Sequence, residues 1–145
     1  MIRIMFETDV QASLSTIWRH YTIEELRKKW EADLEFLAFD GPVATGISGT
    51  MKLSGMSPIR FLLSRIEENR EFTDEVDIPG MGKLEFKHEM FSDSGANHIR
   101  QTVTLHPLSG IAGDKEQSFF QQVTKDIAET VFRLKSTVCT ADSAC

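Results

Sequence analysis

One histidine stands out because it interrupts an apolar row. Within residues 83–91, His88 shares its parity with Leu84, Phe86 and Met90, whereas the positions between them are Lys, Glu, Lys and Glu. Successive side chains of a β-strand point to opposite faces of a sheet. Since the charged set belongs in water, His88 is predicted to face the interior.

An acid and an amide follow the same logic on two nearby stretches. Asp74 shares its parity with Phe72 and Val76, and Gln101 shares its parity with Val103. Inward-facing polar side chains have three interpretations. They form the ordinary hydrogen bonds of a folded interior, they orient a ligand in an apolar cavity, or they act as acid and base on a substrate.

The predicted ligand-binding set joins these polar groups to apolar residues on the same inward faces and on a C-terminal helix. It consists of Asp74, Val76, Phe86, His88, Met90, Gln101, Val103, Phe120 and Ile127. No residue is assigned a catalytic role, because the sequence points to no nucleophile or second partner for an acid–base pair. No cofactor is predicted.

Motifs that hold metals or nucleotides do not occur in the sequence. It contains no HExxH, CxxC, GxSxG, GxGxxG or Walker-type pattern. Of the other histidines, His98 and His106 share a parity opposed to that of His88, and His20 ends a predicted helix. A shared three-histidine site is therefore not expected, and we predict no metal ligand.

Seven strands are predicted to carry these side chains. Their ranges are 4–10, 34–39, 46–53, 59–66, 72–78, 84–91 and 98–105. Short turns rich in Gly, Pro, Asn and Asp separate the last six, which is typical of an antiparallel meander. Gly46 and Gly49 fall in a strand that opens no helix, so they are expected to permit a bulge or close packing.

Three helices are predicted around the strands. Ser13 caps a helix over residues 14–20, and a capping box from Thr22 to Glu25 starts a second helix that ends near Trp30. Apolar residues recur every three or four positions in a long helix over residues 114–136. Trp18 and Trp30 are expected in the core, with the mouth of a cavity as the alternative.

This order of elements predicts an α+β fold. The long amphipathic helix has to bury its stripe against the inner face of the seven-stranded antiparallel sheet, which is the large surface available to it. A sheet of this size twists and curls, so it can wrap around the helix. The space left between the two is the natural place for an apolar ligand cavity.

Composition limits the partners and the setting. The 145 residues suit a single domain, drawn as residues 1–138, with residues 139–145 as a flexible tail that holds Cys139 and Cys145 as reduced thiols. A net charge of −6 disfavours nucleic acid as a partner. No segment has the length of a membrane span, and the N-terminus does not read as a signal peptide, so we expect the cytoplasm. No oligomeric state is inferred.

Several stretches resemble one known family. Residues 10–13 followed by Ile17 and Trp18 resemble the opening of the polyketide cyclase/dehydrase-like branch of the START-like, or SRPBCC, superfamily, although Ser13 stands where a proline is usual. Trp30, Gly46, Phe72, His88, Phe91 and the run 107–110 match further positions of that pattern, in the same order. The likeness runs from about Phe6 to Leu134.

The resemblance implies a helix-grip fold and binding of hydrophobic small molecules such as lipids, polyketides or aromatic compounds. We therefore expect a carrier or sensor of such a ligand. Two alternatives stay open. One is a cyclase- or dehydratase-like enzyme that uses His88 and Asp74 as acid and base, and the other is a protein-interaction module resembling the Hsp90-activator-like branch. The fold carries over from a family more safely than the activity does.

Overall fold

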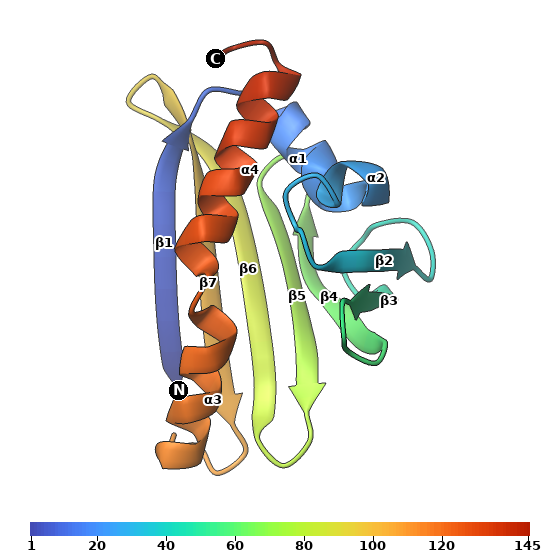
Figure 1. Ribbon diagram of the computed structural model, residues 1–145, viewed down its shortest axis with the longest axis vertical. Helices are drawn as coiled ribbons and strands as arrows, with labels where there is room; N and C mark the ends of the chain where they lie inside the picture. The colour runs from blue at the N-terminus through green and yellow to red at the C-terminus, as the bar shows by residue number, and fades with distance from the viewer.

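Seven antiparallel strands build the framework of the computed structural model, which describes residues 1–145 (Figure 1). The strands are β1 (Ile2–Val10), β2 (Leu34–Phe39), β3 (Ser48–Leu53), β4 (Ile59–Glu67), β5 (Glu71–Ile78), β6 (Gly82–Asp93) and β7 (Ala96–Pro107). They lie in the order β1-β7-β6-β5-β4-β3-β2, so the first strand pairs with the last. The predicted curved seven-stranded antiparallel sheet is confirmed, and in the structure the sheet is not closed into a barrel.

The helices lie together on one side of this sheet (Figure 1). They are α1 (Leu14–Thr22), α2 (Glu24–Arg27), α3 (Asp114–Thr124) and α4 (Ile127–Ala141). The C-terminal pair packs on β1 and β7, whereas α1 contacts β6 and α4, and α2 contacts β2. Ser13 caps α1 as predicted, since its hydroxyl accepts a hydrogen bond from the Thr16 amide at 3.1 Å.

The C-terminal helix is interrupted, whereas one continuous helix was predicted over residues 114–136. α3 ends at Thr124, whose hydroxyl donates to the Phe120 carbonyl at 2.7 Å, and α4 begins after Asp126. Phe120 and Val131 are buried on either side of the break, whereas Val123 beside it is exposed. The apolar residues keep the same helical spacing before and after the break, so their pattern does not reveal it. The break lets both halves of the helix follow the curved sheet.

The prediction for the second short helix is also wrong, both in the extent of the helix and in its cap. α2 has only four residues, its N-cap is Ile23, and no side chain caps it. Thr22 belongs to the end of α1, where its hydroxyl donates to the Trp18 carbonyl at 3.1 Å. The Thr22–Glu25 capping box is therefore not formed, because Thr22 is the last residue of α1.

α4 continues into the segment that was expected to be a flexible tail. The helix ends at Ala141, and Cys139 is buried. Beyond the helix, the Asp142 carboxylate accepts hydrogen bonds from the Ser13 amide at 2.7 Å and from the Thr16 hydroxyl at 2.6 Å. This part of the chain is thus tied to the N-terminal end of α1.

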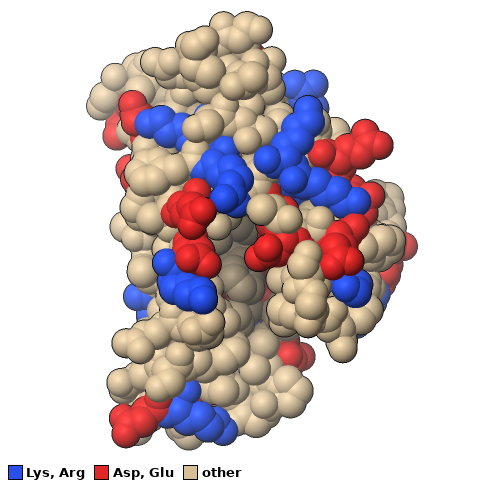
Figure 2. All heavy atoms as spheres, in the orientation of Figure 1, with Lys and Arg blue, Asp and Glu red and all other residues tan.

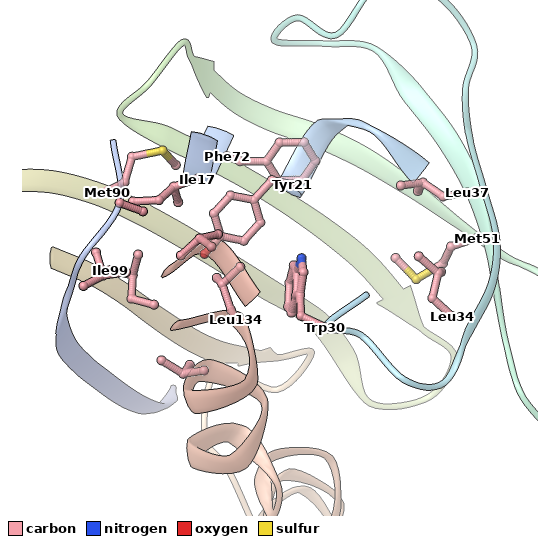
Figure 3. Packing of buried hydrophobic residues seen from close by; sticks show 14 of the residues in the cluster. Ile17, Tyr21, Trp30, Leu34, Leu37, Met51, Phe72, Met90, Ile99 and Leu134 are labelled. Atoms are coloured by element: carbon pink, nitrogen blue, oxygen red, sulfur yellow. The ribbon is translucent and has the colours of Figure 1, made fainter. Parts of the chain in front are cut away.

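The buried apolar side chains form two clusters. The larger one lies beneath α1 and α4 and includes Tyr21, Trp30 and Phe72, whose rings lie close together in Figure 3. The smaller one contains four buried residues, Leu84, Val103, Leu105 and Phe120. Ile127 packs against both clusters, so the start of α4 links them.

Gly49 shows why a glycine is needed in β3. It lies opposite Phe39 on β2 and Phe61 on β4, and the two rings meet edge to face at 5.9 Å. A Cβ atom at residue 49 would stand 2.4 Å from the Phe61 ring and 2.6 Å from the Ala38 carbonyl oxygen. The predicted role of this glycine in close packing is confirmed.

None of the helices combines the length and the apolar character that crossing a membrane requires.

Candidate functional site

The predicted polar residues lie in two neighbouring rows across the inner face of the sheet. In one row, His88 on β6 stands between Phe72 on β5 and Gln101 on β7. In the next row, Asp74 on β5 stands opposite Phe86 on β6. Asp74 and His88 are therefore diagonal neighbours, at a spacing of roughly 7–8 Å that one small group can bridge.

Burial agrees with the strand parity for both ionisable groups. Asp74 is 2% exposed and His88 is 3% exposed. The charged residues of the opposite parity pair with one another on the outer face, as Lys83 does with Glu75 at 3.1 Å. Asp74 and His88 therefore lie in the interior, as the alternation of apolar and charged residues along each strand predicted.

The remaining predicted residues differ in how deeply they are buried. Met90, Val103 and Phe120 are buried, and they belong to the two core clusters. Val76, Phe86, Gln101 and Ile127 are only half-buried. The buried members serve packing first, whereas the half-buried members keep surface available for another molecule.

An ion pair between the buried Arg27 of α2 and the half-buried Glu31 joins this region, and it was not among the predicted site residues. Arg27 is 3% exposed, and its Nε atom donates to the Glu31 carboxylate at 2.7 Å. Its Nη1 atom donates to the Tyr21 carbonyl at 3.3 Å, and its guanidinium carbon lies 5.5 Å from the centre of the Phe72 ring. In the sequence, the i, i+4 spacing of Arg27 and Glu31 indicates that the two side chains can pair.

Two atoms of this region have no hydrogen-bond partner. They are Oδ1 of Asp74 and Nδ1 of His88, both fully shielded from solvent. Leaving a buried polar group without a partner costs about 1–3 kcal/mol. Such atoms call for an explanation, and a bound water or ligand group is one.

Burial also shifts the protonation of both groups. Loss of solvent raises the pKa of the Asp74 carboxyl to about 7, although the Arg27 guanidinium opposes this shift. Loss of solvent lowers the pKa of the His88 imidazole to about 3, and Arg27 adds to the effect. At neutral pH the imidazole is therefore uncharged, and the carboxyl is close to its midpoint of ionisation.

Aromatic rings shield the imidazole. The Tyr21 ring lies 4.7 Å from the His88 ring, and the Phe72 ring lies 6.1 Å from it, between centroids. Burial raises the pKa of the Tyr21 hydroxyl as well. We call Tyr21, Arg27, Glu31, Asp74 and His88 the buried polar centre.

A hollow opens on the face of the molecule shown in Figure 2, between the C-terminal helices and the β2–β3 end of the sheet. Comparison with Figure 1 places this hollow over β5 and β6. These strands contribute the half-buried inner-face residues Val76 and Phe86, and Ile127 begins α4 beside them. The space between sheet and helix is thus open to one side rather than fully enclosed.

Two further pockets lie near α1. One has a volume of about 380 Å³ and is lined mainly by polar residues of α1, α4 and the turn after α2, among them His20 and Lys29. The other has a volume of about 540 Å³ and is lined by Trp18, Val43 and Ile66, among others. Trp18 lines this second pocket and also packs against the larger core cluster, with its ring 6.2 Å from that of Phe72, whereas Trp30 is buried in the core.

The histidines do not gather in one place. His98 lies 3.8 Å from Glu7, and His106 lies 3.9 Å from Glu85. His20 is held in α1, where its Nδ1 atom lies 2.7 Å from the Thr16 carbonyl oxygen and therefore donates to it. Only His88 belongs to the buried polar centre.

Chemically, the centre can exchange hydrogen bonds and protons. The Asp74 carboxyl donates when protonated and accepts when ionised, and the neutral imidazole of His88 has one donor and one acceptor nitrogen. Arg27 is already paired with Glu31, so its charge is largely compensated.

No model of a protein family matches this sequence, and no curated protein matches it. Solved structures do match along nearly the whole chain. Protein MLL2253 from Mesorhizobium loti is 11% identical, with a TM-score of 0.75 over 97% of this chain and 99% of its own. The Aha1 dimer from Colwellia psychrerythraea is 15% identical, with a TM-score of 0.71 over 95% and 96%.

A third similar structure is DynU16, from the dynemicin biosynthetic locus. It is 14% identical to this chain, with a TM-score of 0.70, and the match covers 98% of this chain but 49% of DynU16. At such low identity these likenesses establish the architecture, and the activity has to be argued from the residues of this chain.

Proposed function

We propose, from its START-like helix-grip fold, that this protein binds a hydrophobic small molecule in the hollow over β5 and β6, as a carrier or sensor. The ligand's apolar body would lie against Val76, Phe86 and Ile127, and a polar part would face Asp74 and His88. Gln101, beside His88 in the sheet, is a further candidate contact.

One observation carries this proposal. Half-buried apolar side chains adjoin two shielded polar atoms, Oδ1 of Asp74 and Nδ1 of His88, that have no partner in the folded chain. Apolar walls with a few polar groups that converge on one point are the usual composition of a small-molecule site. The resemblance to START-like proteins implies ligands of the same kind.

A charge placed on the floor of the hollow tests the proposal. Wild-type protein should bind the neutral apolar dye Nile red with a blue-shifted emission, and Phe86→Glu should weaken that binding at least tenfold, because it places a carboxylate against the dye. The matched control is Phe91→Glu, on the opposite face of the same strand, which should bind like the wild type. Equal binding by both variants would contradict the location of the site.

Native mass spectrometry of protein purified without detergent addresses the ligand itself. A bound molecule, extracted and identified, should be predominantly apolar. Recovery of the same molecule unchanged after incubation with the protein would favour a carrier or sensor over an enzyme.

The enzyme alternative has its own supporting observation. A buried carboxyl with a pKa of about 7 can give or take a proton near neutral pH, as a cyclase- or dehydratase-like reaction requires. DynU16, which shares the fold, comes from a biosynthetic locus. A product that differs from the added ligand, and that Asp74→Asn no longer forms, would establish this alternative.

A further inference from the structure

We infer that the ligand of the proposed site is uncharged where it meets the buried polar centre, and that it presents a hydroxyl or carbonyl group to Asp74 and His88. This inference rests on the proposed function and adds the chemical class of the ligand.

The geometry limits the polar part of the ligand to a small group. Asp74 and His88 are diagonal neighbours on adjacent strands, since Asp74 stands opposite Phe86 and His88 stands opposite Phe72. At the spacing of diagonal pairs, roughly 7–8 Å, one oxygen atom between the two side chains can reach both. Phe86 is half-buried beside both groups, so an apolar ring that lies on it can direct such an oxygen inward.

Arg27 is the cation that an acidic ligand would need, and it is already engaged. Its Nε atom donates to Glu31 at 2.7 Å and its Nη1 atom donates to the Tyr21 carbonyl at 3.3 Å. Its planar face lies toward the rings of Phe72 and Trp30, at 5.5 and 5.9 Å. A ligand carboxylate would therefore lie beside the Glu31 carboxylate and compete with it for the same guanidinium, which is costly.

A cationic ligand meets the opposite difficulty. The Glu31 carboxylate, which could receive a cation, is already paired with the Arg27 guanidinium at 2.7 Å. Burial lowers the pKa of the His88 imidazole, and the nearby Arg27 guanidinium adds to the effect. An ammonium group would have to be buried near this guanidinium, whereas a neutral hydroxyl or carbonyl pairs with the unpartnered atoms and adds no charge.

Four naphthalene derivatives separate these possibilities, because they share one apolar body. The probes are naphthalene, naphthol, naphthoate and naphthylmethylammonium, each competed against Nile red at about pH 6, where Asp74 is mostly protonated. Naphthol should bind about three- to tenfold more tightly than naphthalene, which is the value of one hydrogen bond. Naphthoate and naphthylmethylammonium should each bind at least tenfold more weakly than naphthol.

Variants then assign the preference to residues. His88→Leu and Asp74→Leu should each bring naphthol to within about twofold of naphthalene, whereas Asp74→Asn, which keeps neutral hydrogen-bonding groups, should retain the preference. If the leucine variants do not fold, the order of the four probes on the wild type still decides the question.

The outcomes distinguish the two proposals. If Nile red and naphthalene both fail to bind, the proposed function fails, and this inference falls with it. If naphthalene binds and naphthol shows no advantage, ligand binding stands and the inference is overturned, as expected when the centre holds only a structural water.

Tightest binding of naphthoate would show that Arg27 is available to an anion, and tightest binding of the ammonium would show that Asp74 acts as a carboxylate. Either result overturns the inference.

Discussion

At the scale of single residues, Asp74 and His88 share one buried site but respond to pH in opposite directions. The pKa of Asp74 is raised to about 7 in the folded protein, so the stability that its proton confers is complete below about pH 4 and is lost as pH rises through 7. The pKa of His88 is lowered to about 3, so its contribution is complete above about pH 6.5 and is lost as pH falls toward 3. Between about pH 4 and pH 6.5 the two effects oppose each other.

Single substitutions should expose each effect. We expect Asp74→Asn to become less stable on acidification from about pH 6.5 when compared with the wild type, because the His88 effect is then unopposed. We expect His88→Leu to become more stable, relative to the wild type, as pH falls from about 7 to 4. The free energy of unfolding, measured by urea denaturation across this range, checks both expectations, and curves parallel to the wild type would contradict the assigned burial.

Strand alternation was sufficient to predict where these two side chains lie. Because the charged residues of β6 all lie on the outer face of the sheet, His88, which has the opposite parity, has to point inward. The same reasoning applies to Asp74 on β5. Arg27 could not be predicted in this way, because it lies on a helix rather than on a strand, and a long cationic side chain is seldom buried. In the folded protein Arg27 is buried, and its guanidinium donates to the Glu31 carboxylate and to the Tyr21 carbonyl.

At the scale of elements, the end of α4 and the start of α1 form one unit. The pKa of Asp142 is lowered, first by the hydrogen bond from the Thr16 hydroxyl and then by the bond from the Ser13 amide. A carboxylate at this position also suits the positive end of the α1 dipole. Residue 142 thus acts on α1 as an additional capping group, contributed from the opposite end of the chain.

Asp142→Ala should therefore destabilise the protein by roughly 0.5–2 kcal/mol, the range found for the loss of helix-capping groups. The matched control is Asp126→Ala, because Asp126 occupies the N-cap position of α4 but its side chain makes no capping hydrogen bond. Thermal unfolding of the two variants should separate them, with Asp126→Ala within about 0.5 kcal/mol of the wild type. Equal stabilities would show that the contact with α1 contributes nothing measurable.

Elements were easier to predict in kind than in their limits. The strands followed from alternation and the N-cap of α1 followed from Ser13, because both depend on neighbouring residues. The break between α3 and α4 and the docking of Asp142 depend on contacts between distant parts of the chain, which a local pattern does not contain. Short helices such as α2 are also defined more by their surroundings than by propensity.

At the scale of the whole molecule, the interior is divided between two apolar clusters with the hollow on one side. The cluster around Phe72 is covered by α1 and α4, whereas the cluster around Leu105 includes Phe120 of α3. This division follows from the interrupted helix, since each half covers its own part of the curved sheet. The fold class predicted from the sequence is confirmed, and the space beside the C-terminal helices in Figure 2 is an open hollow.

Ile127 is where the two clusters meet, and it tests whether they act as one core. It follows the break between α3 and α4, is half-buried, and packs against both clusters. Ile127→Ala should destabilise the protein by about 2 kcal/mol, at the lower end of the range for removing a large aliphatic side chain from a core, because part of Ile127 is exposed. Ile111→Ala is the matched control, since Ile111 is 78% exposed and should change stability by less than about 0.5 kcal/mol.

Both variants are measured by urea denaturation with two probes. Tryptophan fluorescence reports on the cluster that holds Trp30, and circular dichroism reports on the whole chain. Coincident transitions with the expected loss would indicate one cooperative core joined through Ile127, and an unchanged free energy of unfolding would contradict that role.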